Sequence, residues 1–154
     1  MAVAGGSTLS LSINVILLKD LLLTLLLTCA SIQDIKTRQI PDSLSVAITS
    51  VGFIHFSPLF SLSGMILTGL PYFVAAVISK GKLGGGDIKL MAACGFVLGP
   101  VGGTLQSLIG LTLVLFTAAG IGIKSGYQSA KQTSLPLAPF LSAGGLFAVI
   151  MLQL

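Results

Sequence analysis

Two acidic residues stand out because each lies where an apolar run meets a polar turn. Asp34 ends the first long apolar run, and Asp87 opens a later one. A carboxyl group near hydrocarbon is unfavourable unless it is paired or hydrated, so such a residue indicates a functional site. Two carboxyl groups held close together share one proton, so one can accept a proton from water while the other donates to a peptide carbonyl. The pair therefore predicts peptide hydrolysis with no metal, no cofactor and no covalent intermediate.

Three glycines, Gly84, Gly85 and Gly86, come directly before Asp87. Glycine reaches backbone angles that other residues avoid and lets a second backbone come close. An extended substrate segment would pair with this exposed backbone in the manner of an added strand. The alternative is a flexible loop that ends with Asp87 as a helix N-cap. The glycine run alone leaves both interpretations open.

The other reactive side chains form no competing centre. The chain has one histidine, His55, predicted in the outer half of the bilayer, and one histidine builds neither a metal cluster nor a triad. Cys29 and Cys94 form no C-x-x-C pair, so we interpret both as small packing residues. We expect Lys89 to anchor at lipid headgroups and Asp42 to cap the second helix.

The composition indicates which elements position these residues. Hydrophobic residues make up 54% of the 154, charged residues only 8%, and the mean hydropathy is +1.05. A soluble domain carries roughly 25% charged residues, so this surface predicts contact with lipid. The net charge of +4 is too small and too scattered for a nucleic-acid interface.

A membrane-spanning helix needs about 20 mostly apolar residues. We expect one all-α transmembrane domain over residues 1–154, built as a polytopic bundle of about six helices. The apolar runs predict spans over these ranges: Asn14–Gln33, Ser43–Phe60, Leu62–Ser79, Asp87–Gly99, Thr104–Ile123 and Ser134–Leu154. Glycines at helix-packing spacing support a compact bundle.

The basic residues predict the orientation of these spans. Apart from Lys19, they fall in or beside alternate connections, and the connections between them carry no charge. The positive-inside rule then makes the three basic connections cytoplasmic and both termini external. Asp34 and Asp87 are thereby predicted at the same, cytoplasmic, edge. The basic residues are Lys36, Arg38, Lys80, Lys82, Lys89, Lys124 and Lys131.

Three motifs in order resemble the type IV prepilin peptidases. Residues 84–93, GGGDIKLMAA, look like the G-x-G-D signature stretch of that family. Asp34 followed by Ile40 and Pro41 looks like the family's first aspartate and its Ile-Pro turn. Residues 135–140, LPLAPF, look like its third cytoplasmic, proline-containing loop.

The resemblance implies a membrane aspartyl endopeptidase of the bacterial or archaeal cytoplasmic membrane, with its catalytic loops in the cytoplasm. It implies prepilin or pseudopilin substrates, in which a short basic leader precedes the scissile bond and a hydrophobic helix follows it. Oligomeric state stays open. Asp34 and Asp87 match the catalytic aspartates, and a substrate-binding or supporting role falls to Gly84, Gly85, Gly86, Pro41, Asp42 and Lys89.

Larger members carry an N-terminal cytoplasmic loop with paired cysteines, which is linked to methylation of the cleaved product. No such pair occurs here, so we expect cleavage without methylation. Two alternatives to a protease stay open: a non-catalytic membrane subunit of a pilus or secretion system, and an ion-translocating subunit. The second expects acids spread through the depth of the membrane, whereas these gather at one face.

Overall fold

A computed structural model describes residues 4–79, 84–125 and 136–153, and over these ranges the protein is helical. This confirms the predicted all-α class. The elements in chain order are α1 (Ala4–Thr37), α2 (Asp42–Gly52), the short 3-10 helix η1 (Phe53–His55), α3 (Pro58–Ile78), α4 (Gly85–Ser125) and α6 (Ala138–Gln153).

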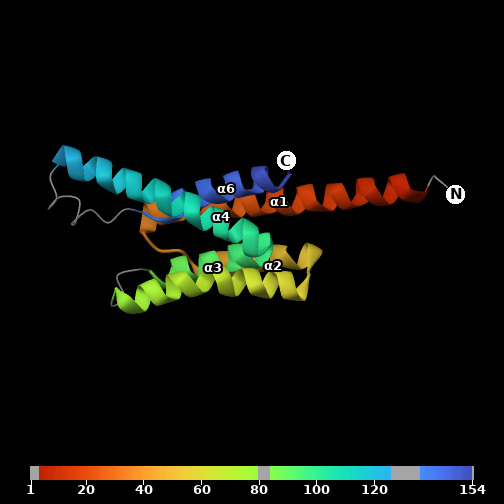
Figure 1. Ribbon diagram of the computed structural model, residues 1–154, viewed down its shortest axis with the longest axis horizontal. Helices are drawn as coiled ribbons and strands as arrows, with labels where there is room; N and C mark the ends of the chain where they lie inside the picture. Colours follow the sequence, from red (N-terminus) through yellow and green to blue (C-terminus); the bar gives the residue numbers. More distant parts are fainter. Residues whose placement is uncertain (1–3, 80–83, 126–135, 154) are drawn as a thin grey trace.

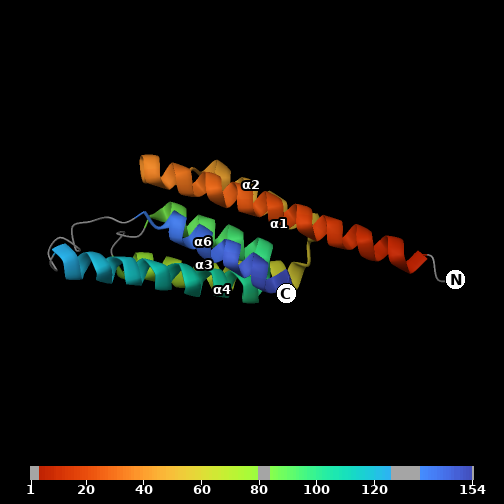
Figure 2. The same ribbon diagram turned by 90° about the horizontal axis from the view of Figure 1, so that it is seen from above.

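The helices pack around α4 and α1. Helix α3 lies along α4, while α6 packs between α4 and α1, and α2 contacts both α1 and α4 (Figures 1 and 2). The N-terminal part of α1 extends beyond the other helices (Figure 1). Buried apolar side chains from four helices form the main core, among them Leu23, Leu27, Ile48, Leu90 and Ala148.

The described helices suit a membrane. Three are long and apolar enough to cross one: Ile13–Thr37 of α1, Pro58–Ile78 and Gly85–Ile121 of α4, while α6 is apolar but shorter. Large apolar side chains lie on the outside of the molecule, Leu59, Phe116 and Ile123 among them. In water such a surface would be strongly unfavourable, and in lipid it is not. We conclude that this is an integral membrane protein; the predicted number of six spans is not confirmed.

The fourth and fifth predicted spans form one element, α4, that reverses direction. Gly99 has a positive φ of 73° inside the helix, and Pro100 follows it. Positive φ is open mainly to glycine, and proline is well suited to starting the next helical segment. The second half of α4 then runs in roughly the opposite direction to the first half (Figure 1). Near the reversal, Gly103 lies close to the backbone of Gly95. The expected connection at 99–103 is thus a single non-helical residue.

Helix α3 approaches α4 closely because small residues face each other. A side chain added at Gly95 would collide with Thr68 and with the backbone of Gly64. The buried Thr68 hydroxyl donates to the carbonyl oxygens of Gly64 and Met91, at 2.8 and 2.9 Å. The predicted role of small residues in helix packing is confirmed for this pair of helices.

The predicted packing role of the cysteines holds for one of them. Cys94 is buried in the main core, whereas Cys29 is exposed on α1. The prediction for Cys29 was wrong because an apolar run in a membrane protein also contains the residues that face lipid.

Candidate active site

Asp34 lies in the last turns of α1 and is buried, with 7% of its surface exposed. Its Oδ2 accepts a hydrogen bond of 2.9 Å from the backbone N–H of Ala138, the first residue of α6. The first N–H groups of a helix have no partner within that helix, so a carboxyl group is a favourable acceptor there. This contact joins α6 to α1 and fixes the orientation of the Asp34 carboxyl.

The segment that supplies this N–H is held by its own apolar contacts. Leu137 and Ile88 pack against a small buried cluster of Tyr72, Met91 and Leu141. Pro139, the second residue of α6, lacks an N–H and is well tolerated in the first turn of a helix. The proline-containing loop is thereby anchored to α3 and α4, which places the Ala138 amide at Asp34.

Asp87 lies in the first turn of α4 and is partly buried. Its N–H donates to the carbonyl oxygen of Gly84 at 3.1 Å, and the helix begins at Gly85. Asp87 is therefore not the N-cap that the alternative interpretation expected, because the helix begins two residues before it.

The two glycines directly before Asp87 provide space, not unusual backbone angles. Gly85 and Gly86 are helical residues of α4, so the expected unusual backbone angles are not found at these two positions. A side chain at Gly86 would press on Ile40, 3.0 Å from its Cβ, whereas one at Gly85 would meet nothing within 4 Å. Gly86 thus lets the start of α4 lie against the turn that follows α1, and this brings Asp87 toward Asp34.

Asp34 and Asp87 line the same cavity, which has a volume of about 240 Å³. Gly84, Gly85 and Gly86 form another part of the wall. The cavity thus holds two carboxyl groups beside an exposed stretch of backbone, and one water molecule fits easily within its volume.

Three wall residues were not weighed as site residues from the sequence: Arg38, Gln39 and Ile40. Arg38 takes a left-handed conformation, with φ of 53°, and its N–H donates to the Asp34 carbonyl oxygen at 2.8 Å. It thereby ends α1 at the position where glycine is the usual residue. Their place shortly after Asp34, in the segment that leads to the Ile-Pro turn, was the available signal, because residues next to a site residue in the chain also lie near it in space.

The remaining candidates lie outside this cavity. Lys89 Nζ lies 2.7 Å from both carboxylate oxygens of Asp42, and both side chains are more than half exposed. Asp42 is the first residue of α2, and Pro41 is the N-cap with no side-chain cap bond. The capping role predicted for Asp42 is therefore wrong, because its carboxylate is engaged by Lys89. The structure does not bring Pro41, Asp42 or Lys89 to the walls around the two aspartates.

Lys80, Lys82 and Lys131 lie outside the described residues. His55 ends η1, at the far end of α2 from the aspartates. Over 4–79, 84–125 and 136–153, no three His, Cys, Asp or Glu residues gather as ligands of a metal ion would.

The matches of this chain to known proteins all indicate the same family. A profile of the type IV leader peptidase family matches residues 21–123. The chain is 31% identical, over 151 residues, to a prepilin leader peptidase/N-methyltransferase of Pectobacterium carotovorum subsp. carotovorum, covering 85% of this chain and 50% of that protein. A protein of the same description from Bacillus subtilis (strain 168) is 36% identical over 77 residues, covering 50% of this chain and 30% of that protein. The chain thus spans half or less of these relatives, and no solved structure matches it.

Proposed function

This chain belongs to the type IV leader peptidase family, and from that premise we propose that it is an aspartyl endopeptidase that cleaves prepilin-type substrates. Asp34 and Asp87 are the proposed catalytic pair. The observation that carries the proposal is that these residues, from two helices far apart in sequence, line one cavity of about 240 Å³. Each lies at an end of its helix, where a substrate backbone can approach.

The proposed reaction is hydrolysis by a water molecule held between the two carboxyl groups. One carboxylate takes a proton from the water molecule while the water oxygen attacks the scissile carbonyl carbon. The other carboxyl group gives its proton to the carbonyl oxygen of the substrate. The tetrahedral intermediate then collapses, the C–N bond breaks, and the leaving amine takes a proton from the pair. Water supplies all the atoms that are added, so no other reactant is needed.

The walls of the cavity support specific roles. The Ala138 N–H holds the Asp34 carboxyl in one orientation, which reduces the reorganisation needed during reaction. Gly84 and Gly85 are exposed and add no side chain that would keep a substrate backbone away. An extended segment around the scissile bond would lie against them.

We propose that the catalytic cavity faces the cytoplasm and that the chain crosses the membrane about six times. Lys36, Arg38 and Lys89 all lie near the two aspartates in the chain, which favours the cytoplasm under the positive-inside rule. The reversal at Gly99 lets the two halves of α4 make separate crossings. A substrate of the kind the resemblance implies could then keep its apolar helix in lipid while its basic leader reaches water.

The direct test is to incubate the purified chain in detergent with a prepilin and to measure product masses. We expect two fragments whose masses add up to the substrate plus one water. In heavy-oxygen water the label should enter the new carboxyl group of the leader. An intact prepilin that stays bound would instead favour a non-catalytic pilus subunit, and ion flux in liposomes without cleavage would favour an ion-translocating subunit.

A further inference from the structure

A second hollow lies where the end of α1 meets the start of α2, with a volume of about 500 Å³, and is called here the α1–α2 hollow. The Thr37 hydroxyl donates to the carbonyl oxygen of Gln39 at 3.1 Å, which ties the end of α1 to the turn that follows it. Ile40 and Pro41 supply an apolar part of the wall. The polar side chains of the wall, apart from Thr37, are Gln33, Lys36, Gln39 and Ser43.

These polar side chains are available to a molecule that enters the hollow. All four are exposed, and none has a hydrogen bond or ion pair with a described residue. Pro41, the N-cap of α2, gives the first N–H groups of that helix no side-chain acceptor. Ammonium, amide, hydroxyl and backbone N–H groups all donate to an anionic oxygen, so the wall favours an anion.

No acid of this chain supplies the counter-charge for Lys36. The chain has four acidic residues, and all four are described. Two line the catalytic cavity, one pairs with Lys89 and one bonds Gln153, and none of them lines the α1–α2 hollow. A counter-charge for Lys36 therefore has to come from outside the chain.

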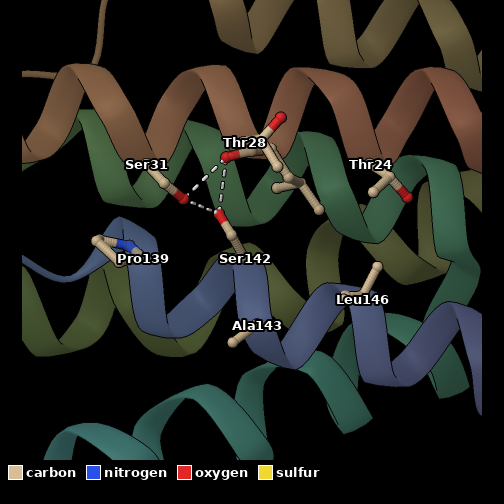
Figure 3. A pocket seen from close by; sticks show the side chains of 8 residues that line it. Thr24, Thr28, Ser31, Pro139, Ser142, Ala143 and Leu146 are labelled. Atoms are coloured by element: carbon tan, nitrogen blue, oxygen red, sulfur yellow. Dashed lines mark hydrogen bonds between the residues drawn. The ribbon is translucent and has the colours of Figure 1, made fainter.

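The hollow between α1 and α6 lacks these features. Its volume is about 300 Å³, and its lining includes Thr24, Thr28, Ser31 and Ser142 (Figure 3). Ser31 donates to Ser142, and the other hydroxyls bond to backbone carbonyl oxygens of α1. Its lining has no charged side chain and its hydroxyls are already paired, so this hollow offers an anion no partner.

The α1–α2 hollow lies at the end of an apolar helix face. Lys36 is in the last turn of α1, where the apolar span Ile13–Thr37 ends. The residues before Lys36 on this face are exposed, so in a membrane they contact acyl chains, and Lys36 then lies at the level of the headgroups. Four residues at helical spacing form this face: Leu25, Cys29, Ile32 and Lys36.

We propose that the α1–α2 hollow binds the phosphate group of an anionic phospholipid, with Lys36 as its charged contact and the acyl chains along the exposed face of α1. Free phosphate is also an anion but lacks the chains that would cover that face. Gln39 and Ile40 line both this hollow and the catalytic cavity, so a bound headgroup would lie against one wall of that cavity. The inference concerns binding and does not depend on the proposed function.

The test measures lipid contact at Cys29, which is exposed two turns before Lys36, whereas Cys94 is buried. The full chain is labelled at Cys29 with a bimane fluorophore and reconstituted in phosphatidylcholine vesicles. Brominated phosphatidylglycerol should quench the label more strongly than brominated phosphatidylcholine at the same mole fraction. Both lipids carry a phosphate, but only phosphatidylglycerol has a net negative charge.

Variants of Lys36 identify the contact. One basic residue contributes about 1 kcal/mol to the binding of anionic lipid, so Lys36→Gln should weaken the preference for phosphatidylglycerol about fivefold. Lys36→Arg keeps the charge and should retain the preference. Lys19→Gln is the matched control, because it removes the same charge from the same helix outside the hollow, and it should leave the preference unchanged.

Three results would overturn the proposal. The first is equal quenching by the two brominated lipids in the unchanged chain, a comparison that needs no variant to fold. The second is an equal loss of preference in Lys36→Gln and Lys19→Gln, which would indicate a general charge effect. The third is loss of the preference in excess inorganic phosphate, because the hollow would then take soluble anions. All of these results concern lipid binding, so the proposed function would be decided separately by prepilin cleavage.

Discussion

At the scale of single residues, the candidate site depends on how the Asp34 carboxyl is held. It is buried at the end of α1, and the one hydrogen bond described for its side chain comes from the first N–H of α6. Asp87 is less buried and lies in the first turn of α4. The two carboxyl groups thus line one cavity in unlike surroundings, which is the usual arrangement where one of a pair keeps a proton and the other does not.

We expect Ala138→Pro to lower kcat because proline has no N–H to donate to Asp34. The first helical position tolerates proline, so α6 should still form. Loss of one hydrogen bond to a charged group predicts a rate roughly ten- to a hundredfold lower. Steady-state cleavage of a prepilin measures it. Ala138→Gly retains the N–H and should stay close to the unchanged chain; equal losses in both variants would contradict a role for this bond.

At the scale of elements, the sequence predicted that the apolar runs form helices, because long apolar runs and glycine or proline breaks determine helices locally. The second predicted span, Ser43–Phe60, differs from the structure, because this stretch holds the short α2 and η1 and ends inside α3. The sequence did not predict that α4 has only one non-helical residue at its reversal, since that depends on the packing of Gly95 against α3. Nor did it predict the ion pair between Asp42 and Lys89, which are far apart in the chain. Contacts between distant segments depend on the tertiary arrangement, so propensity alone misses them.

The α3–α4 contact gives a prediction for stability. Gly95→Ala puts a methyl group against Thr68 and the Gly64 backbone, so it should lower the free energy of unfolding by about 1–3 kcal/mol. Unfolding of the purified chain in detergent measures the change. Gly120→Ala is the matched control in the same helix, where an added Cβ meets nothing within 4 Å. A variant at Gly95 as stable as the one at Gly120 would contradict the close approach.

At the scale of the whole molecule, the proposed reaction requires both aspartates on one side of the membrane. The described structure supports this, since the end of α1 and the start of α4 line one cavity. From charge and hydropathy alone, the sequence predicted that these two ends lie at the same edge of the membrane, and the approach of their carboxyl groups was a hypothesis. Their catalytic role stays a prediction, because a shared cavity is a condition for reaction and not the reaction itself.

The orientation is tested by thiol labelling in membranes, in a chain that has Cys29 replaced by serine. Lys36→Cys, near the aspartates, should react with a membrane-impermeant reagent in inside-out vesicles and be protected in right-side-out ones. Ser57→Cys, at the opposite end of the bundle before α3, should show the reverse pattern. Labelling of both positions from the same side would contradict the proposed orientation.

The most direct test of the proposed catalytic pair is the cleavage rate of a prepilin by Asp34→Asn and by Asp87→Asn. Both changes keep the shape of the side chain and remove its ability to exchange a proton, so each should lower the rate by at least about a hundredfold. Asp20→Asn is the control, because that carboxylate bonds Gln153 and lies outside the catalytic cavity; its rate should be unchanged. If either catalytic-pair variant stays folded and cuts at the rate of the control, these two aspartates are not the catalytic pair.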